Sequence, residues 1–166
     1  RQALYGGTYE PYSISIIEGV AMIGEEWIFY AGLARTSSLE EVSHTRDWVV
    51  REIAALAAGE TAERLASRGL NHTAGKQNDM ERASRLARRA ILHYGLSEKW
   101  GTTAVPTGMS DEAYIASLTE ARRALLESEE QALVAQGRDL AQQVLEANFK
   151  SAVIPLATAL AEKGIM

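Results

Sequence analysis

Several residue types and patterns are absent from this sequence or scarce in it. The 166 residues contain no cysteine, which excludes both a disulfide framework and a thiolate metal site. No apolar run approaches the roughly 20 residues that cross a bilayer, and no signal peptide is visible. The net charge of −5 argues against nucleic-acid binding as the main function. We therefore expect a soluble domain without a nucleic-acid partner, which would reach a membrane only through segments outside this chain.

What the chain does contain fits one globular domain over residues 1–166, with 46% hydrophobic residues. Residues 12–17 alternate polar and apolar side chains, and residues 27–30 form a short aromatic run. Gly19 and Gly24 punctuate the segment between them, which favours a β-hairpin. The remainder follows helical spacing and the chain has only 3 prolines. The predicted fold is α+β and predominantly helical, with a short N-terminal β-hairpin followed by a helical bundle with a long C-terminal helix.

Capping residues predict where the helices begin. Ser38, with Glu41 three residues later, predicts the start of a first helix that ends near Ser67. A second helix is expected from residue 78 to about 93, and Ser110 predicts the start of a long helix to about residue 147. Ser151 predicts the start of a last helix with Pro155 in its first turn.

The stretch TAGKQNDMERA, residues 73–83, is a glycine-containing loop that leads into a helix with an acidic first turn. Asn78 is the expected cap, with Glu81 completing a capping box. Asp79 then lies where free backbone N–H groups and the helix dipole favour a negative charge. From the residues alone, this aspartate is either a metal ligand or part of an ordinary helix start.

The same stretch resembles the third-ligand segment of the FtsH-type, ATP-dependent zinc metalloproteases, in which a Gly-x-x-Asn-Asp-(Leu/Met)-x-x-Ala pattern carries a zinc-binding aspartate. Four other blocks resemble this family in the same order along the chain. They are SII at 15–17 with Gly24, AGETAER at 58–64, YGLSEKWG at 94–101 and MSDE at 109–112. The resemblance implies that Asp79 is a zinc ligand.

The resemblance also implies binding partners and a location in the cell. They are a zinc ion, ATP bound by an AAA+ ATPase module outside this chain, a homo-hexamer, and unfolded polypeptides as substrates. The family is anchored in membranes, so the domain is expected on the cytoplasmic face of one. In the family, an edge strand beside the zinc binds substrate by strand addition. The matching residues here are Ile28, Phe29 and Tyr30, although an ordinary strand that packs aromatic side chains also explains them.

The motif His-Glu-x-x-His, which would supply two zinc ligands and a general base, is absent from these residues. The 3 histidines, His44, His72 and His93, are scattered, so no catalytic residue is assigned in this chain. Counting back from Asp79 places the family's motif at or just before Arg1, which is not a methionine. We expect a peptidase domain truncated at its N-terminus and inactive alone. The alternative is a non-catalytic assembly domain of an FtsH-like ring that has lost the motif.

Overall fold

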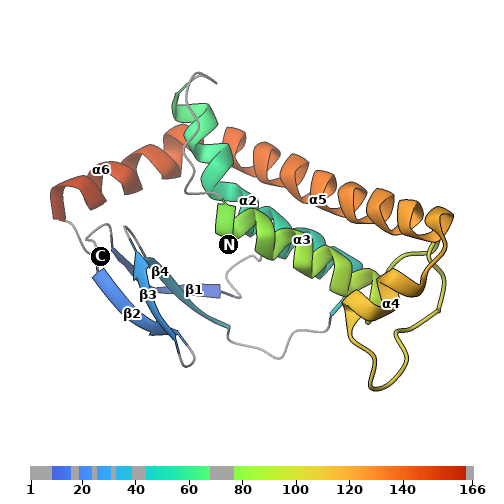
Figure 1. Cartoon of the computed structure of the whole chain (residues 1–166). Coiled ribbons are helices and arrows are strands. Elements are labelled where there is room, and N and C mark those ends of the chain that lie inside the picture. Colours follow the sequence, from blue (N-terminus) through green and yellow to red (C-terminus); the bar gives the residue numbers. More distant parts are fainter. Residues whose placement is uncertain are drawn as a thin grey trace. The chain divides into compact units, whose positions relative to one another are not determined.

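The computed structural model describes residues 9–15, 19–23, 26–30, 33–38, 44–67 and 77–163. The described residues are predominantly helical, as the sequence predicts (Figure 1). The chain divides into two compact units, one formed by Arg1–Glu41 with Val144–Met166 and the other by Val42–Gln143. Within the second unit the described residues form helices and loops, without a strand.

The described residues of the first unit contain four strands, which form two pairs. They are β1 (Tyr9–Ser15), β2 (Gly19–Ile23), β3 (Glu26–Tyr30) and β4 (Leu33–Ser38). β1 pairs antiparallel with β4, and its register shifts between Pro11 and Ser13. β2 pairs antiparallel with β3, with Gly19 opposite Tyr30.

The hairpin predicted between residues 12–17 and 27–30 is not supported, because the two segments have different partners. Side-chain alternation indicates that a segment is extended, but it does not identify the strand across from it. The prediction treated the segment from Gly19 to Gly24 as a connection, whereas residues 20–23 are a short apolar run that forms β2.

The second unit begins with α2 (Arg46–Ala66), which starts later than predicted. Thr45 caps it, since its hydroxyl oxygen accepts a hydrogen bond of 3.1 Å from the backbone N–H of Trp48. The predicted cap, Ser38, lies instead at the end of β4. The next helix, α3 (Gln77–Leu92), ends where the sequence predicts, and its buried residues include Ala83, Ala87, Ala90 and Ile91.

The long helix predicted from Ser110 is interrupted near its start. Ser110 caps α4 (Asp111–Ser117), as expected, and accepts a hydrogen bond of 3.2 Å from the N–H of Ala113. Leu118 then has an extended backbone, with ψ of 150°. α5 (Glu120–Asn148) follows, and the Thr119 hydroxyl accepts a hydrogen bond from the N–H of Arg122. The periodic pattern concealed this break because no glycine or proline marks it.

After α5 the backbone continues through a π-helical segment, η2 (Phe149–Val153), into α6 (Ile154–Lys163). The last helix therefore begins later than predicted, with Pro155 in its first turn. Ser151 does not cap it, since its hydroxyl donates to the carbonyl of Asn148.

The helical stretch from Glu120 to Lys163 contains an 18-residue window that is long and apolar enough to cross a membrane, and 6% of that window is buried. The window can contain up to two charged residues, so it does not contradict the absence of an unbroken apolar run of roughly 20 residues. One such helix, judged by length and composition only, is weak evidence of a span.

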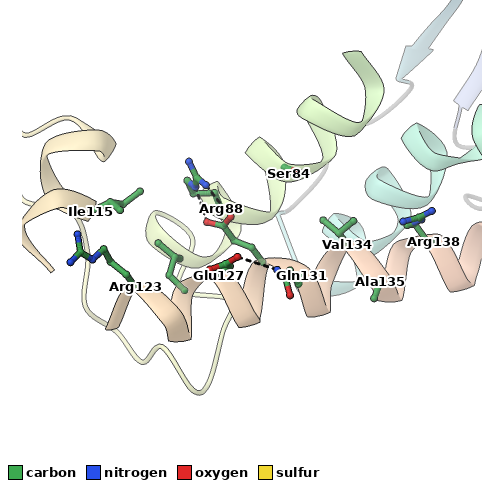
Figure 2. A pocket seen from close by; sticks show the side chains of 11 residues that line it. Ser84, Arg88, Ile115, Arg123, Glu127, Gln131, Val134, Ala135 and Arg138 are labelled. Atoms are coloured by element: carbon green, nitrogen blue, oxygen red, sulfur yellow. Dashed lines mark hydrogen bonds and ion pairs between the residues drawn. The ribbon is translucent and has the colours of Figure 1, made fainter. Parts of the chain in front are cut away.

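α3 and α5 are joined by a bidentate ion pair beside an open groove (Figure 2). Arg88 of α3 donates from Nε to one carboxylate oxygen of Glu130 at 2.7 Å and from Nη2 to the other at 3.0 Å. This hydrogen bonding raises the pKa of Arg88 above its ordinary value, against the opposing effect of burial. Apolar side chains of α5, among them Leu126 and Val134, line the groove beside the pair.

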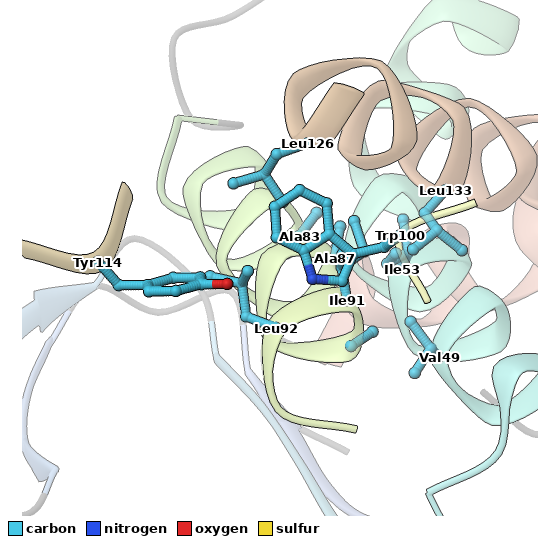
Figure 3. Close-up of a cluster of buried hydrophobic side chains, with 11 residues drawn as sticks. Val49, Ile53, Ala83, Ala87, Ile91, Leu92, Trp100, Tyr114, Leu126 and Leu133 are labelled. Carbon is cyan, nitrogen blue, oxygen red and sulfur yellow. The ribbon is translucent and has the colours of Figure 1, made fainter. Parts of the chain in front are cut away.

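The core of the second unit is one cluster of buried side chains from α2, α3, α4, α5 and the loop after α3 (Figure 3). Its members are Val49, Ile53, Ala83, Ala87, Ala90, Ile91, Leu92, Trp100, Tyr114, Leu126 and Leu133. Trp100 is 2% exposed and has the largest fully buried side chain. Its indole N–H donates to the carbonyl of Thr103 at 3.2 Å, so this polar atom is satisfied inside the cluster.

Candidate functional site

Asp79 lies in the first turn of α3, where the sequence predicts a carboxylate. Its side chain is 44% exposed, and its nearest ionic partner is Nη1 of Arg82, at 3.6 Å. The capping box predicted with it is wrong, because α3 begins at Gln77 and Asn78 lies inside the helix. Glu81 accepts a hydrogen bond of 3.1 Å from the side-chain amide of Gln77. Asp79 therefore lies at a helix N-terminus, and its ionic contact within the described residues is the 3.6 Å one with Arg82.

A single carboxylate of this kind fits one position in a zinc site, but it cannot form the site. Structural and catalytic zinc sites use three or four protein ligands. No group of three or more His, Asp or Glu side chains that could hold a metal occurs among the described residues. If Asp79 is a zinc ligand, as the resemblance implies, the other ligands lie outside the described residues.

The described histidines contact residues other than Asp79. His93 lies at the other end of α3, about 21 Å along the helix axis at 1.5 Å per residue, too far to share a metal ion with Asp79. Its Nε2 is 2.8 Å from a carboxylate oxygen of Asp111. The His44 ring packs against Trp48 at 4.7 Å and Tyr94 at 4.8 Å between ring centroids. His72 lies outside the described residues.

The segment that follows α3, YGLSEKWG at residues 94–101, is held to α5 by a buried carboxylate. The Ser97 hydroxyl donates to one oxygen of Glu129 at 2.9 Å, and Lys99 Nζ donates to the other at 2.9 Å. Both Ser97 and Glu129 are buried. The hydrogen bonds from Lys99 and then from Ser97 lower the pKa of Glu129, while burial acts in the opposite direction. We call these three side chains the Glu129 clamp.

Backbone geometry explains the two glycines of the same segment. Gly95 has a φ of +64° and Gly101 a φ of +81°, values that residues with a Cβ rarely adopt. Between them, Ser97 also accepts a hydrogen bond of 3.1 Å from the N–H of Trp100. Arg46 of α2 donates to the carbonyl of Leu96 at 3.0 Å. The segment therefore joins α2 and α5 around the end of α3, and its described contacts are structural.

Sequence reasoning missed Glu60 and Glu129, two of the buried glutamates, which join helices to other parts of the unit. Glu129 lies three residues after Leu126 and four before Leu133, both buried, so the helical stripe itself placed it in the core. Glu60 of α2 is likewise buried and accepts a hydrogen bond of 3.1 Å from Arg138 of α5. A glutamate on an apolar stripe is the signal that would have identified both.

The proposed substrate-binding residues Ile28, Phe29 and Tyr30 lie in β3, at register positions opposite Ala21, Val20 and Gly19 of β2. Among the described strands, β3 pairs with β2 only. Because a strand has two hydrogen-bonding edges, this pairing leaves the other edge of β3 without a partner strand in the described part of the chain. Substrate binding by these residues stays a prediction.

Comparison with known proteins agrees with the resemblance. The family model of peptidase family M41 matches residues 31–166. The ATP-dependent zinc metalloprotease YME1 homolog of Schizosaccharomyces pombe is 30% identical over 135 residues, which cover 80% of this chain. The chain spans 18% of the length of that protein. Residues 15–17 and Gly24, the first of the five resembling blocks, lie outside the family match, and the other four lie inside it. The chain belongs to peptidase family M41 and corresponds to an FtsH-type peptidase domain.

Proposed function

We propose that this chain is part of the peptidase domain of an ATP-dependent zinc metalloendopeptidase, and that Asp79 contributes one ligand of its zinc ion. The observation that carries the proposal is the position of Asp79 in the family-matched region, in the first turn of α3 and 44% exposed. A carboxylate there is accessible to a metal, and its only ion pair within the described residues is the long contact with Arg82. Two histidines and a general-base glutamate would come from a His-Glu-x-x-His segment, which we place before Arg1.

A bound zinc ion would supply a polarised water for peptide hydrolysis. The Asp79 carboxylate would be one of the side chains that hold it. An extended, unfolded substrate would pair through its backbone with the edge of β3 that no described strand occupies, near Ile28, Phe29 and Tyr30. This mode depends little on the substrate's sequence. ATP would be hydrolysed by an AAA+ module outside this chain, and the assembly would be a homo-hexamer. Attachment to a membrane, with this domain on its cytoplasmic face, belongs to the same proposal.

The test uses the longer polypeptide in which the chain follows a His-Glu-x-x-His segment. Zinc content is measured by atomic absorption, peptidase activity with casein, and ATPase activity separately. Asp79→Asn should weaken zinc binding by more than about a hundredfold, since losing even a group that only orients a ligand costs about 10–100-fold. Casein degradation should fall with it, and ATPase activity should remain.

Asp139→Asn is the matched control, because Asp139 is an exposed aspartate of α5 and the change removes the same charge. It should leave zinc content and proteolysis unchanged. If Asp79→Asn retained zinc and activity, Asp79 would not be a ligand.

A second candidate function is a non-catalytic assembly domain of an FtsH-like ring. It is compatible with the described residues, among which no three His, Asp or Glu side chains form a group that could hold a metal ion. If the residues before Arg1 contain no His-Glu-x-x-His and the whole protein forms rings without zinc or proteolysis, this second function replaces the first.

A further inference from the structure

Arg82 is the ionic partner of the side chain proposed to bind zinc. It follows Asp79 by three residues on α3, a spacing that puts both on the same side of the helix. Arg82 Nη1 is 3.6 Å from Asp79 Oδ1, close enough for an ion pair but beyond hydrogen-bonding distance. The two side chains are 54% and 44% exposed. A metal ion on the Asp79 carboxylate would therefore have a guanidinium as a neighbour.

The contact with Asp79 is the only ion pair of Arg82 within the described residues. Arg88 of the same helix is instead held by two hydrogen bonds to Glu130 of α5, at 2.7 and 3.0 Å. In the part of the chain that the structure describes, the paired counter-charge of Arg82 is thus the carboxylate proposed to bind the metal.

A loose pair of this kind opposes metal binding in two ways. The guanidinium partly neutralises the carboxylate, which weakens its attraction for a cation, and the guanidinium itself repels a divalent ion. Arginine cannot relieve this repulsion by losing its proton, because it stays charged in proteins. Hydrogen bonds that orient a ligand raise metal affinity instead, but the 3.6 Å contact of Arg82 is too long to be one. The geometry therefore favours repulsion over support.

We propose that Arg82 pairs with Asp79 when the metal is absent and lowers the zinc affinity of the complete site. This inference rests on the proposed function, in which Asp79 is a zinc ligand. Zinc–oxygen bonds are about 2.1 Å long, so the ion would lie roughly 6 Å from the guanidinium. In water, Coulomb repulsion at that distance reduces affinity about sevenfold in 10 mM salt and about threefold in 150 mM salt. Arg82 would thus make the bound zinc easier to exchange.

The test measures the zinc dissociation constant of the longer polypeptide, with its His-Glu-x-x-His segment, by competition with a fluorescent chelator. Arg82→Gln removes the charge, and Arg82→Lys keeps it. Arg85→Gln is the matched control, because it removes an exposed arginine of the same helix that lies about 9 Å along the axis from Asp79. Asp79→Asn reports in the same assay whether Asp79 is a ligand. Circular dichroism verifies the fold of each variant.

Arg82→Gln should bind zinc about sevenfold more tightly than the parent protein in 10 mM salt, and about threefold more tightly in 150 mM salt. Arg82→Lys should bind as the parent protein does, because it keeps the charge. Arg85→Gln should change the affinity less than about 1.5-fold in 150 mM salt, since its charge is more than a Debye length away.

Three results would overturn this inference and leave the proposed function standing, provided that Asp79→Asn loses zinc. They are unchanged or weaker zinc binding by Arg82→Gln, tighter binding by Arg82→Lys, and an equal gain in Arg85→Gln, which would show an effect of net charge alone. If Asp79→Asn bound zinc as tightly as the parent protein, or if the parent protein bound none, the proposed function would fail and this inference with it.

Discussion

Replacing Glu129 with glutamine tests whether the Glu129 clamp stabilises the helical unit. The change preserves the shape of the side chain and removes its charge. The glutamine oxygen can still accept one hydrogen bond, from Ser97 or from Lys99. The glutamine NH2 group then faces the other of these two donors, to which it cannot act as an acceptor. One buried donor or acceptor is left without a partner, whichever way the amide is turned.

The expected cost follows from the exposure of each partner. A hydrogen bond to a charged group contributes about 1.5–3 kcal/mol, and Ser97 and Glu129 are both buried, so that this value applies to their contact. The Lys99 side chain is 72% exposed, and its ion pair is therefore worth at most about 1 kcal/mol. Since glutamine keeps part of the first contact and loses the second, we expect Glu129→Gln to lower the free energy of unfolding by about 2 kcal/mol at pH 7.

The same clamp predicts a dependence on pH. The folded state lowers the pKa of Glu129, so the carboxylate contributes stability above its unfolded pKa of about 4.3. That contribution is lost as the pH falls through the folded-state value. The difference in stability between the parent chain and Glu129→Gln should therefore be full at pH 7 and shrink below pH of about 4.

Urea unfolding followed by circular dichroism at a series of pH values measures this difference. Glu127→Gln is the control, because Glu127 is an exposed neighbour on α5 whose hydrogen bond partner is Gln131. It should change stability by less than about 0.5 kcal/mol. Equal stability of Glu129→Gln and the parent chain at pH 7, or a difference that stays constant into acid, would refute the reasoning.

Two further predictions concern helix packing and capping. A Cβ at Gly137 of α5 would clash with the Ile53 side chain of α2, so Gly137→Ala should destabilise by about 1–3 kcal/mol in urea unfolding, whereas Gly59→Ala, with open space around it, should stabilise by up to about 1 kcal/mol. Two destabilised variants, or two stabilised ones, would contradict this packing. Ser110→Ala should cost about 1 kcal/mol and lower Tm by roughly 2–4 °C, because the N–H of Ala113 loses its acceptor. Ser84→Ala on an exposed face of α3 should not lower Tm, and an equal loss in both would show that the cap is unimportant.

Local sequence signals predicted the helices better than their ends or their partners. Apolar spacing predicted the helix that forms α3, because burial of a helix face repeats along the sequence itself. Ser38 has the fuller capping box, with Glu41 three residues later, whereas Ala113 stands three residues after Ser110. Yet only Ser110 caps a helix, since Ser38 lies in β4. The strand partners could not be predicted at all, because pairing depends on contacts between segments far apart in the chain.

The candidate site likewise has one part that local sequence predicts and other parts that it does not. Asp79 could be placed from a short motif, since its position at a helix start depends only on its immediate neighbours. The Glu129 clamp depends on Ser97, 32 residues away, and no local pattern connects the two. The remaining metal ligands could not be predicted from these residues because a metal site is formed by side chains from several segments.

The resembling segment at 94–101 and the aspartate of α3 therefore have separable roles. Ser97 and Lys99 fix α5 through Glu129, at the end of α3 opposite Asp79. If the clamp serves only the scaffold, Glu129→Gln in the longer polypeptide should lower stability while zinc affinity at pH 7 stays unchanged. Asp79→Asn should do the reverse, because its exposed side chain contributes little to packing. A Glu129→Gln protein that remains folded but loses zinc would show that the clamp also positions the metal site.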